Sequence, residues 1–144
     1  MSEASQVILI VDDSAEDREM ITLALRKAGI TNPIANAPNG ADALDYLKRS
    51  GSYADRQPGH PVLILLDIKM PKVDGISVLQ TLKRDLALAI IPTVIFTSSA
   101  ADEDLSNCYR LGANAFVQKP VDYQKFFATV ACIGMFWIEV NSTD

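Results

Sequence analysis

Cysteine, histidine and long apolar runs are scarce in this sequence, and each scarcity excludes a class of protein. The two cysteines, Cys108 and Cys132, lack the CxxC spacing of redox and metal motifs, so we expect small buried side chains in a reducing compartment. The single histidine, His60, has no clear acidic or nucleophilic companion in its segment and is expected to be an ordinary loop residue. The longest apolar stretch, 126–138, is interrupted by Thr129 and is shorter than the ~20 residues of a membrane-spanning helix.

An excess of positive charge is also missing. The formal net charge of -5 argues against a general nucleic-acid binder, which is expected to carry a basic patch. The first six residues are polar and acidic, unlike the basic start of a signal peptide. A hydrophobic content of 49% with 22% charged residues is normal for a globular chain. We therefore expect a cytosolic protein without a membrane or nucleic-acid partner, folded as one domain over residues 1–144 with no output domain.

Short apolar runs alternate with amphipathic stretches along the chain, and this alternation predicts an α/β fold. We expect a doubly wound, five-stranded parallel sheet flanked by five helices. The expected strands are 7–11, 34–37, 62–66, 93–96 and 115–118. The expected helices run from Ser14 to Ala28, from Ala41 to Arg49, from Gly75, from Asp102 to Leu111, and from about Asp122 to about Asn141. Ser14 can cap the first of these helices, with Asp17 in the capping-box position. The segment 50–60 is long for a loop in such a fold, and is either a partner-facing loop or a tolerated insertion.

Residues suited to phosphoryl transfer follow four of these strands. They are Asp12 with Asp13, then Asp67, then Thr97, then Lys119. Ligands of an open parallel sheet bind beyond the carboxyl ends of the strands, so these side chains should meet at one edge. Three carboxylates, a hydroxyl and an ammonium at one place can bind a hard cation, attack phosphorus and neutralise the product.

The adjacent acids Asp12 and Asp13 have two interpretations. Alone, they would more often cap the following helix, whose dipole favours negative charge. Opposite Asp67, three nearby carboxylates would repel one another unless one takes a proton or a cation enters. Mg²⁺ suits such a group because it prefers oxygen ligands and is bound through one or two carboxylates plus a phosphate.

Asp67 is the candidate nucleophile, because a carboxylate can attack phosphorus and form an acyl phosphate. Lys119 can supply a fixed ammonium and Thr97 a hydroxyl to the phosphate oxygens. The Lys119–Pro120 bond can adopt the cis form, which would aim the lysine back over the edge of the sheet. Taken alone, Lys119 would more often be a solvated lysine, and Thr97 an ordinary β-branched strand residue. Taken together with the three aspartates, the two residues favour the phosphoryl-transfer interpretation.

This set of motifs closely resembles the receiver domain of two-component response regulators. The motifs are Asp12-Asp13, the Asp67-x-x-Met70-Pro71 segment, Asp74-Gly75, Thr97-Ser98 and Lys119-Pro120. The resemblance covers Val7 to about Glu139. The long loop before the third strand and the aromatic end, 136–139, look more narrowly like single-domain regulators paired with phytochrome histidine kinases.

The resemblance implies roles for the residues at the strand ends. Asp67 would accept the phosphoryl group from a phosphohistidine of a partner kinase, and Thr97 and Lys119 would contact the phosphoryl oxygens. Asp13 would bind Mg²⁺ most directly, with Asp12 acting through water. The backbone carbonyl of Lys69 and the Asp67 carboxylate would complete the protein ligands.

The resemblance also implies a conformational switch and residues that set the lifetime of the phosphoryl group. Thr97 would move toward the phosphoryl group, and Phe116 would turn into the vacated space. Lys69 and Ser99, two residues beyond Asp67 and Thr97, would tune the phosphoryl lifetime. The protein would be a signalling protein rather than an enzyme, passing its signal to a phosphotransfer or effector protein.

The last helix predicts a homodimer. Phe126, Val130, Ile133 and Trp137 recur at helical spacing and can cover the sheet. A second apolar stripe then remains for a partner, since a surface helix needs only one. Its expected interface residues are Phe127, Met135, Phe136 and Ile138. The preceding helix and the 50–60 loop could instead cover this stripe within one molecule.

Three other functions remain to be separated by experiment. An aspartyl-phosphate phosphohydrolase would need its nucleophile on the first strand, two residues before a second aspartate, which the Val11–Ser14 segment lacks. A flavodoxin-like flavin binder would need a phosphate-binding loop after that strand, where this chain is acidic. A scaffold receiver would act without phosphorylation, although all the expected reactive positions are present. Phosphoester hydrolysis, flavin absorbance and Mg²⁺-dependent labelling by acetyl phosphate would distinguish these classes.

Overall fold

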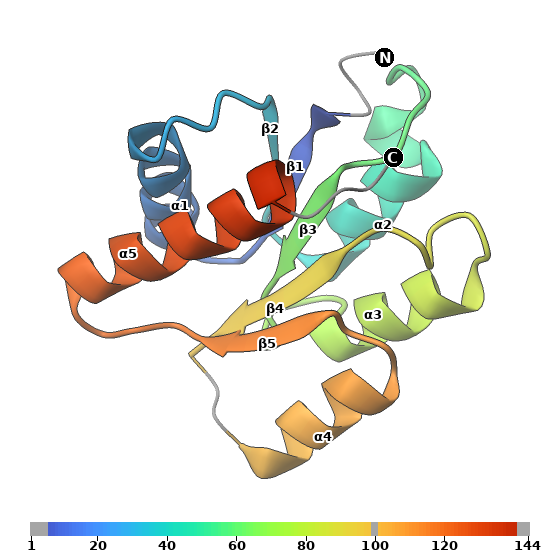
Figure 1. Ribbon diagram of the computed structural model, residues 1–144. Coiled ribbons are helices and arrows are strands. Elements are labelled where there is room, and N and C mark those ends of the chain that lie inside the picture. The colour runs from blue at the N-terminus through green and yellow to red at the C-terminus, as the bar shows by residue number, and fades with distance from the viewer. Residues whose placement is uncertain (1–5, 99–100, 141–144) are drawn as a thin grey trace.

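Parallel strands form the central sheet of the molecule (Figure 1). The computed structural model describes residues 6–98 and 101–140. The strands are β1 (Ile8–Val11), β2 (Ile34–Ala37), β3 (Leu63–Leu66), β4 (Thr93–Thr97) and β5 (Ala115–Gln118). They lie in the order β2-β1-β3-β4-β5, and every neighbouring pair is parallel. The predicted five-stranded, doubly wound sheet is confirmed.

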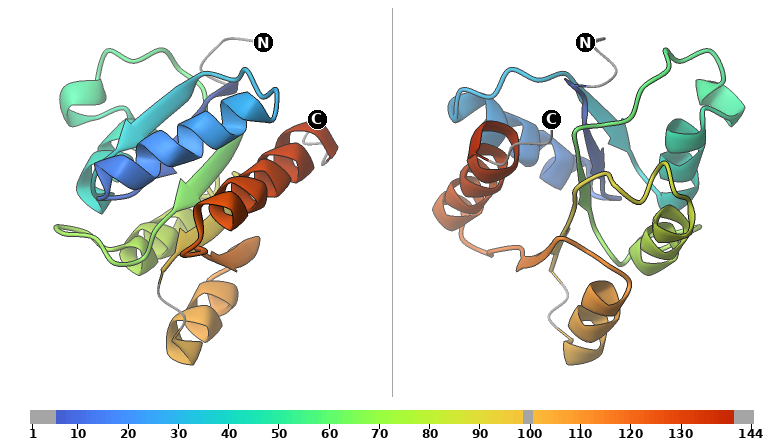
Figure 2. Two further views of the ribbon diagram at one scale, coloured as in Figure 1. Left: turned by 90° about the vertical axis from the view of Figure 1, so that its left-hand side faces the viewer. Right: turned by 45° about the vertical axis from the view of Figure 1, so that its right-hand side comes forward.

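Helices cover both faces of the sheet (Figure 2). They are α1 (Ala15–Lys27), α2 (Gly40–Lys48), α3 (Gly75–Arg84), α4 (Asp102–Arg110) and α5 (Tyr123–Gly134). On one face, α1 and α5 pack against every second strand residue, such as Ile8 and Ile10 of β1. On the other face, α2, α3 and α4 pack against the alternate residues, such as Leu9 and Val11. Because both faces are buried, the central strands are uninterrupted apolar runs.

The end of the chain departs from the expected α-helix. α5 ends at Gly134, and a π-helical segment continues from Met135 to Val140, so the chain is helical nearly as far as expected but its last part is π-helical. Asn141 itself lies outside the described residues. Gly134 lies so close to α1 that an added Cβ would be 2.7 Å from Leu25 Cδ2 of α1 and would also meet Ile30, just after that helix. The wider π turn changes which side chains face inward.

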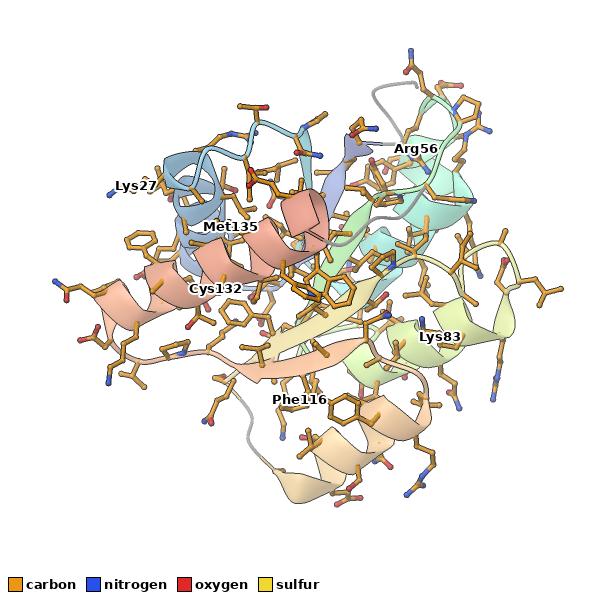
Figure 3. All side chains as sticks on the ribbon, viewed as in Figure 1. Lys27, Arg56, Lys83, Phe116, Cys132 and Met135 are labelled. Carbon is orange, nitrogen blue, oxygen red and sulfur yellow. The ribbon has the colours of Figure 1, made fainter. Side chains whose placement is uncertain are left out.

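The 50–60 segment is folded rather than extended. A short 3-10 turn spans Gly51–Tyr53, and Arg56 anchors the remainder (Figure 3). The Arg56 guanidinium donates to the carbonyl oxygens of Tyr46, Gln57 and Gly59 and lies 4.2 Å from the Tyr46 ring centroid. The insertion therefore has a defined conformation, held against the end of α2.

The two cysteines have different environments. Both are free, but Cys108 of α4 is buried whereas Cys132 of α5 is exposed, so the expectation that both are buried is wrong for Cys132. Its neighbours Val130 and Ile133 take the positions that face the core, leaving Cys132 on the outer side of the helix. Among the residues that the structure describes, no helix has the length and apolar content needed to cross a membrane.

Candidate functional site

Residues just beyond the strands are held in line with the sheet by backbone hydrogen bonds. The Asp67 amide donates to the Val11 carbonyl at 2.9 Å, and the Lys119 amide donates to the Thr97 carbonyl at 2.7 Å. These bonds extend the ladder past the carboxyl ends of β3 and β5. As a result, the side chains of Asp67 and Lys119 meet at one edge of the sheet, as the sequence predicts.

Three carboxylates gather at this edge. One oxygen each of Asp12, Asp13 and Asp67 lies within 4.8 Å of the others. Asp12 and Asp67 are buried, and Asp13 is exposed. Asp12 Oδ1 accepts from the Ser14 amide at 2.9 Å and Asp67 Oδ1 from the Ile68 amide at 2.7 Å, which orients both groups. An oxygen-only donor set open on one side fits a hard divalent cation such as Mg²⁺.

Lys119 is the buried counter-charge of these carboxylates. Its Nζ lies 2.6 Å from Asp12 Oδ2 and 3.1 Å from Asp67 Oδ2. Burial alone would lower the pKa of Lys119, but hydrogen bonds to Asp12 and Asp17 and the nearby negative charges hold it above its ordinary value. Burial raises the pKa of Asp12, and Lys119 offsets this only in part. The site therefore keeps a charged ammonium and retains an excess of carboxylates.

Asp17 is a third partner of Lys119 that the sequence reasoning missed. Its Oδ2 lies 2.8 Å from Lys119 Nζ. The sequence assigned Asp17 only to a capping box with Ser14, and the structure bears out half of that assignment: Ser14 Oγ accepts from the Asp17 amide at 3.1 Å. The Asp17 carboxylate is engaged with Lys119. Its place in the first turn of a helix that starts at the site was the available signal.

The loop after β3 is fixed by a close backbone approach. Asp74 caps α3 by accepting from the Ser77 amide at 2.9 Å, and the Gly75 amide donates to the Ile68 carbonyl at 2.7 Å. A Cβ on Gly75 would lie 1.9 Å from the Asp67 carbonyl oxygen. Glycine at this position therefore lets the start of α3 press against the candidate nucleophile.

The remaining predicted positions surround this centre. Thr97 is buried at the end of β4, and the Lys69 side chain is exposed beyond Asp67. Ser99 lies outside the described residues. The described residues contain no cis peptide bond, so Lys119–Pro120 is trans, unlike the cis form considered from the sequence. The lysine reaches the carboxylates from a trans backbone.

Phe116 lies on β5 and faces α4 (Figure 3). It is half-buried and packs against the core on the side of α2, α3 and α4. Its amide donates to the Tyr109 hydroxyl of α4 at 3.2 Å. Phe116 is therefore connected to the outer helix as well as to the strand that carries Lys119.

The residues of the predicted dimer interface fall into two groups. Met135 and Phe136 are 46% and 50% exposed. Phe127 and Ile138, expected on the same outer stripe, are half-buried against the core between α1 and α5, and Lys27 Nζ lies 5.3 Å from the Phe127 ring centroid. The close α1 packing and the π-helical end bring these two side chains inward. The available apolar surface is smaller than the sequence indicates.

Comparisons with known proteins agree with this fold and identify its family. The model of the response regulator receiver domain matches residues 8–131. Response regulator Rcp1 of Synechocystis sp. is 33% identical over 138 residues, which cover 96% of this chain and 92% of the relative. A Mn²⁺-bound structure of Rcp1 covers 95% of this chain and 97% of its own, with 33% identity and a TM-score of 0.89. The phosphorylated cyanobacterial phytochrome response regulator RcpA is 32% identical, covers 96% of this chain and 98% of its own, and has a TM-score of 0.90. This chain belongs to the receiver domains of two-component response regulators.

Proposed function

We propose that this receiver domain accepts a phosphoryl group on Asp67 from the phosphohistidine of a partner histidine kinase, in a reaction that depends on Mg²⁺. The position of the Asp67 carboxylate carries the proposal. Its Oδ2 lies 3.1 Å from Lys119 Nζ, and one of its oxygens lies within 4.8 Å of those of Asp12 and Asp13. A nucleophile between an ammonium and a cation-binding pair suits phosphoryl transfer, whose catalysis is mainly positioning and charge neutralisation.

In the transfer, one carboxylate oxygen of Asp67 attacks the phosphorus. A P–O bond forms while the P–N bond to the kinase imidazole breaks, and the imidazole nitrogen keeps the bonding electron pair. Lys119 neutralises charge on the phosphoryl oxygens, and Thr97 donates its hydroxyl to one of them. Mg²⁺, held by Asp12, Asp13, Asp67 and the Lys69 carbonyl, would supply further positive charge. The reported phosphorylated RcpA and Mn²⁺-bound Rcp1 support this chemistry by similarity.

The test is labelling of the purified protein by acetyl phosphate with and without Mg²⁺. Asp67→Asn is nearly isosteric and should fold but take no label, and wild type should need the cation. Asp55→Asn, in the exposed 50–60 loop, is the matched control and should label normally. Equal labelling of Asp67→Asn and wild type would show that the acceptor is elsewhere. A wild type that never labels would favour the scaffold alternative.

Phosphorylation would operate a switch through Thr97 and Phe116. The phosphoryl group adds negative charge and strong acceptors, which draw the Thr97 hydroxyl toward it. Phe116 then turns into the vacated space, and its amide contact with Tyr109 transmits the change to α4. A structure of the beryllofluoride complex tests this step, and unmoved Thr97 and Phe116 would contradict it.

Lys69 would tune the lifetime of the phosphoryl group. Its side chain is exposed two residues beyond Asp67, where it can hinder or orient the attacking water. The same role is expected for Ser99. Substitution of Lys69 by alanine should change the dephosphorylation rate and leave stability within about 0.5 kcal/mol of wild type, as for other exposed positions. An unchanged decay rate would reject the role.

The C-terminal helix would form a homodimer interface. Met135 and Phe136 are the most exposed of its four predicted contacts, whereas Phe127 and Ile138 are half-buried against the core. Large apolar side chains and few charges are typical of interface cores. Sedimentation should show dimers for wild type and monomers for Phe136→Glu. Leu86→Glu, at an exposed apolar residue after α3, is the matched control and should remain dimeric. A wild-type monomer at all concentrations would end the dimer proposal.

The proposed partner is a sensor histidine kinase, in the cytoplasm, and the named relatives favour the phytochrome type. The signal would leave by contact with a phosphotransfer or effector protein. Incubation with candidate kinases, followed by the rate of phosphoryl transfer to Asp67, would identify the cognate kinase. Equal rates with all kinases would argue against a dedicated phytochrome partner.

A further inference from the structure

The ammonium of Lys119 has no spare donor. An ammonium carries three N–H groups, and the three carboxylate oxygens around Nζ belong to Asp12 at 2.6 Å, Asp17 at 2.8 Å and Asp67 at 3.1 Å. The donor that now serves Asp67 Oδ2 can pass to an oxygen of a phosphoryl group on Asp67, but a second contact to that group has to be taken from Asp12 or Asp17. Phosphorylation must therefore redistribute the contacts of Lys119.

The three carboxylates differ in how easily they can release the lysine. The Asp12 side chain is only 2% exposed, so water cannot replace its ammonium contact. The Asp17 side chain is 28% exposed and lies in the first turn of α1, where water and the helix dipole both stabilise a free carboxylate. Of the three carboxylates, Asp17 is therefore the one whose contact with Lys119 can be broken at the lowest free-energy cost.

Asp17 also stands apart from the cation-binding group. The three oxygens that lie within 4.8 Å of one another come from Asp12, Asp13 and Asp67. A bound cation would neutralise those carboxylates and weaken their attraction for the Lys119 ammonium. It would not neutralise Asp17, whose charge would still be balanced by Lys119. Asp17 therefore competes with a phosphoryl group for Lys119 whether or not the cation is present.

We propose that Asp17 is a positioning residue that holds the Lys119 ammonium toward α1 in the unphosphorylated protein, and that a phosphoryl group on Asp67 draws the lysine away from it. This inference rests on the proposed phosphorylation of Asp67. Loss of the Asp17 carboxylate should leave the lysine more available and favour the phosphorylated form. The contact also connects the site to the first turn of α1, which a phosphoryl group would release.

Two measurements test the proposal. In the protein without phosphate, NMR of the Lys119 ammonium should show faster exchange of its protons with water in Asp17→Asn than in wild type, because one of its three charged acceptors is lost. In the presence of Mg²⁺, beryllofluoride should bind Asp17→Asn about fivefold more tightly, the change expected for loss of one partly exposed ion pair. Glu16→Gln is the matched control: it removes the same charge from the same turn, where Glu16 contacts only the Tyr123 hydroxyl among the described polar contacts, at 3.3 Å.

A double-mutant cycle separates competition for Lys119 from simple charge repulsion. If Asp17 acts through the lysine, Asp17→Asn should have no effect on beryllofluoride binding in a Lys119→Met background. Equal tightening by Glu16→Gln, or tightening that persists without Lys119, would overturn the proposal. Unchanged exchange of the Lys119 ammonium protons in Asp17→Asn would overturn it too, as would faster exchange without tighter binding. Failure of the phosphorylation proposal looks different: Asp67→Asn and wild type would then respond alike to beryllofluoride, while the NMR comparison still decides whether Asp17 holds the lysine.

Discussion

Replacement of Lys119 by methionine should destabilise the fold, and Mg²⁺ should restore much of the loss. Methionine keeps an unbranched stem of similar length, so packing changes little while the ammonium disappears. Asp12 and Asp67, which lie 2.6 Å and 3.1 Å from Nζ, then remain buried without their counter-charge. The cost arises from those two carboxylates rather than from the lysine itself.

The magnitude follows from the burial of each partner. Removing one member of a buried ion pair costs about 3–5 kcal/mol, because the other charge remains uncompensated. The Asp17 contact is partly exposed and adds at most about 1 kcal/mol. Protonation of Asp12 relieves part of this cost, since burial already raises its pKa. We expect a loss of about 3 kcal/mol at neutral pH, or a Tm lowered by about 10 °C for a chain of this size.

Urea unfolding of wild type and Lys119→Met, with and without Mg²⁺, measures these effects. Burial raises the pKa of Asp12, and the variant lacks the lysine that partly offsets this, so the ionised Asp12 carboxylate destabilises the fold above its unfolded pKa and the deficit should shrink as the pH falls. Mg²⁺ should stabilise the variant more than wild type, because it replaces the missing positive charge. Lys83→Met is the control: Lys83 donates to the Ala89 carbonyl at 3.0 Å away from the acids, and its loss should be small and independent of Mg²⁺. A loss below about 1 kcal/mol in Lys119→Met, or equal Mg²⁺ stabilisation of variant and wild type, would refute the reasoning.

Three further predictions follow from the same structure. Gly75→Ala should lower the free energy of unfolding by about 2–4 kcal/mol and abolish most labelling by acetyl phosphate, because the new Cβ would lie 1.9 Å from the Asp67 carbonyl oxygen. Normal labelling and stability would show that the backbone moves to accommodate the Cβ. A thiol reagent should modify exposed Cys132 in the folded protein and buried Cys108 only on unfolding. A fast-reacting thiol in the folded Cys132→Ser variant would contradict this. Burial raises the pKa of Cys108 from 9.0 to about 11, so its stabilising contribution is complete below pH 9.0 and lost as the pH rises through about 11. The unfolding free energy should therefore fall less steeply over that range in Cys108→Ala than in wild type, and identical slopes would argue against the shift.

Most of the sheet and of the reactive edge was predictable, because both depend on local sequence patterns. A buried parallel strand needs an uninterrupted apolar run, and the polar residue that ends the run marks the carboxyl edge of the sheet. Asp12, Asp67 and Lys119 therefore come together once the strands are recognised. The order of the strands then brings residues from β1, β3 and β5 into one site.

The features that were missed depend on contacts between distant segments. Asp17 had a sufficient local explanation as a capping residue, and its place in the first turn of a helix that starts at the site does not indicate that its partner is a lysine from the far end of the chain. Helical periodicity placed Ile138 on the outer stripe, but the π-helical turn after Gly134 changes the spacing and packs Ile138 against the core. The folded 50–60 loop depends on Arg56, whose four hydrogen bonds to three carbonyl oxygens follow no recognisable local motif.

The most direct test of the central claim is chemical identification of the phosphorylated residue. An acyl phosphate is reduced by borohydride to an alcohol, so a phosphorylated aspartate is converted to homoserine, which peptide mass spectrometry can locate. After treatment with acetyl phosphate and Mg²⁺, the conversion should occur at Asp67 and should disappear when Mg²⁺ is omitted. Conversion at Asp12 or Asp13 in place of Asp67, or conversion at Asp67 that does not need the cation, would contradict the account.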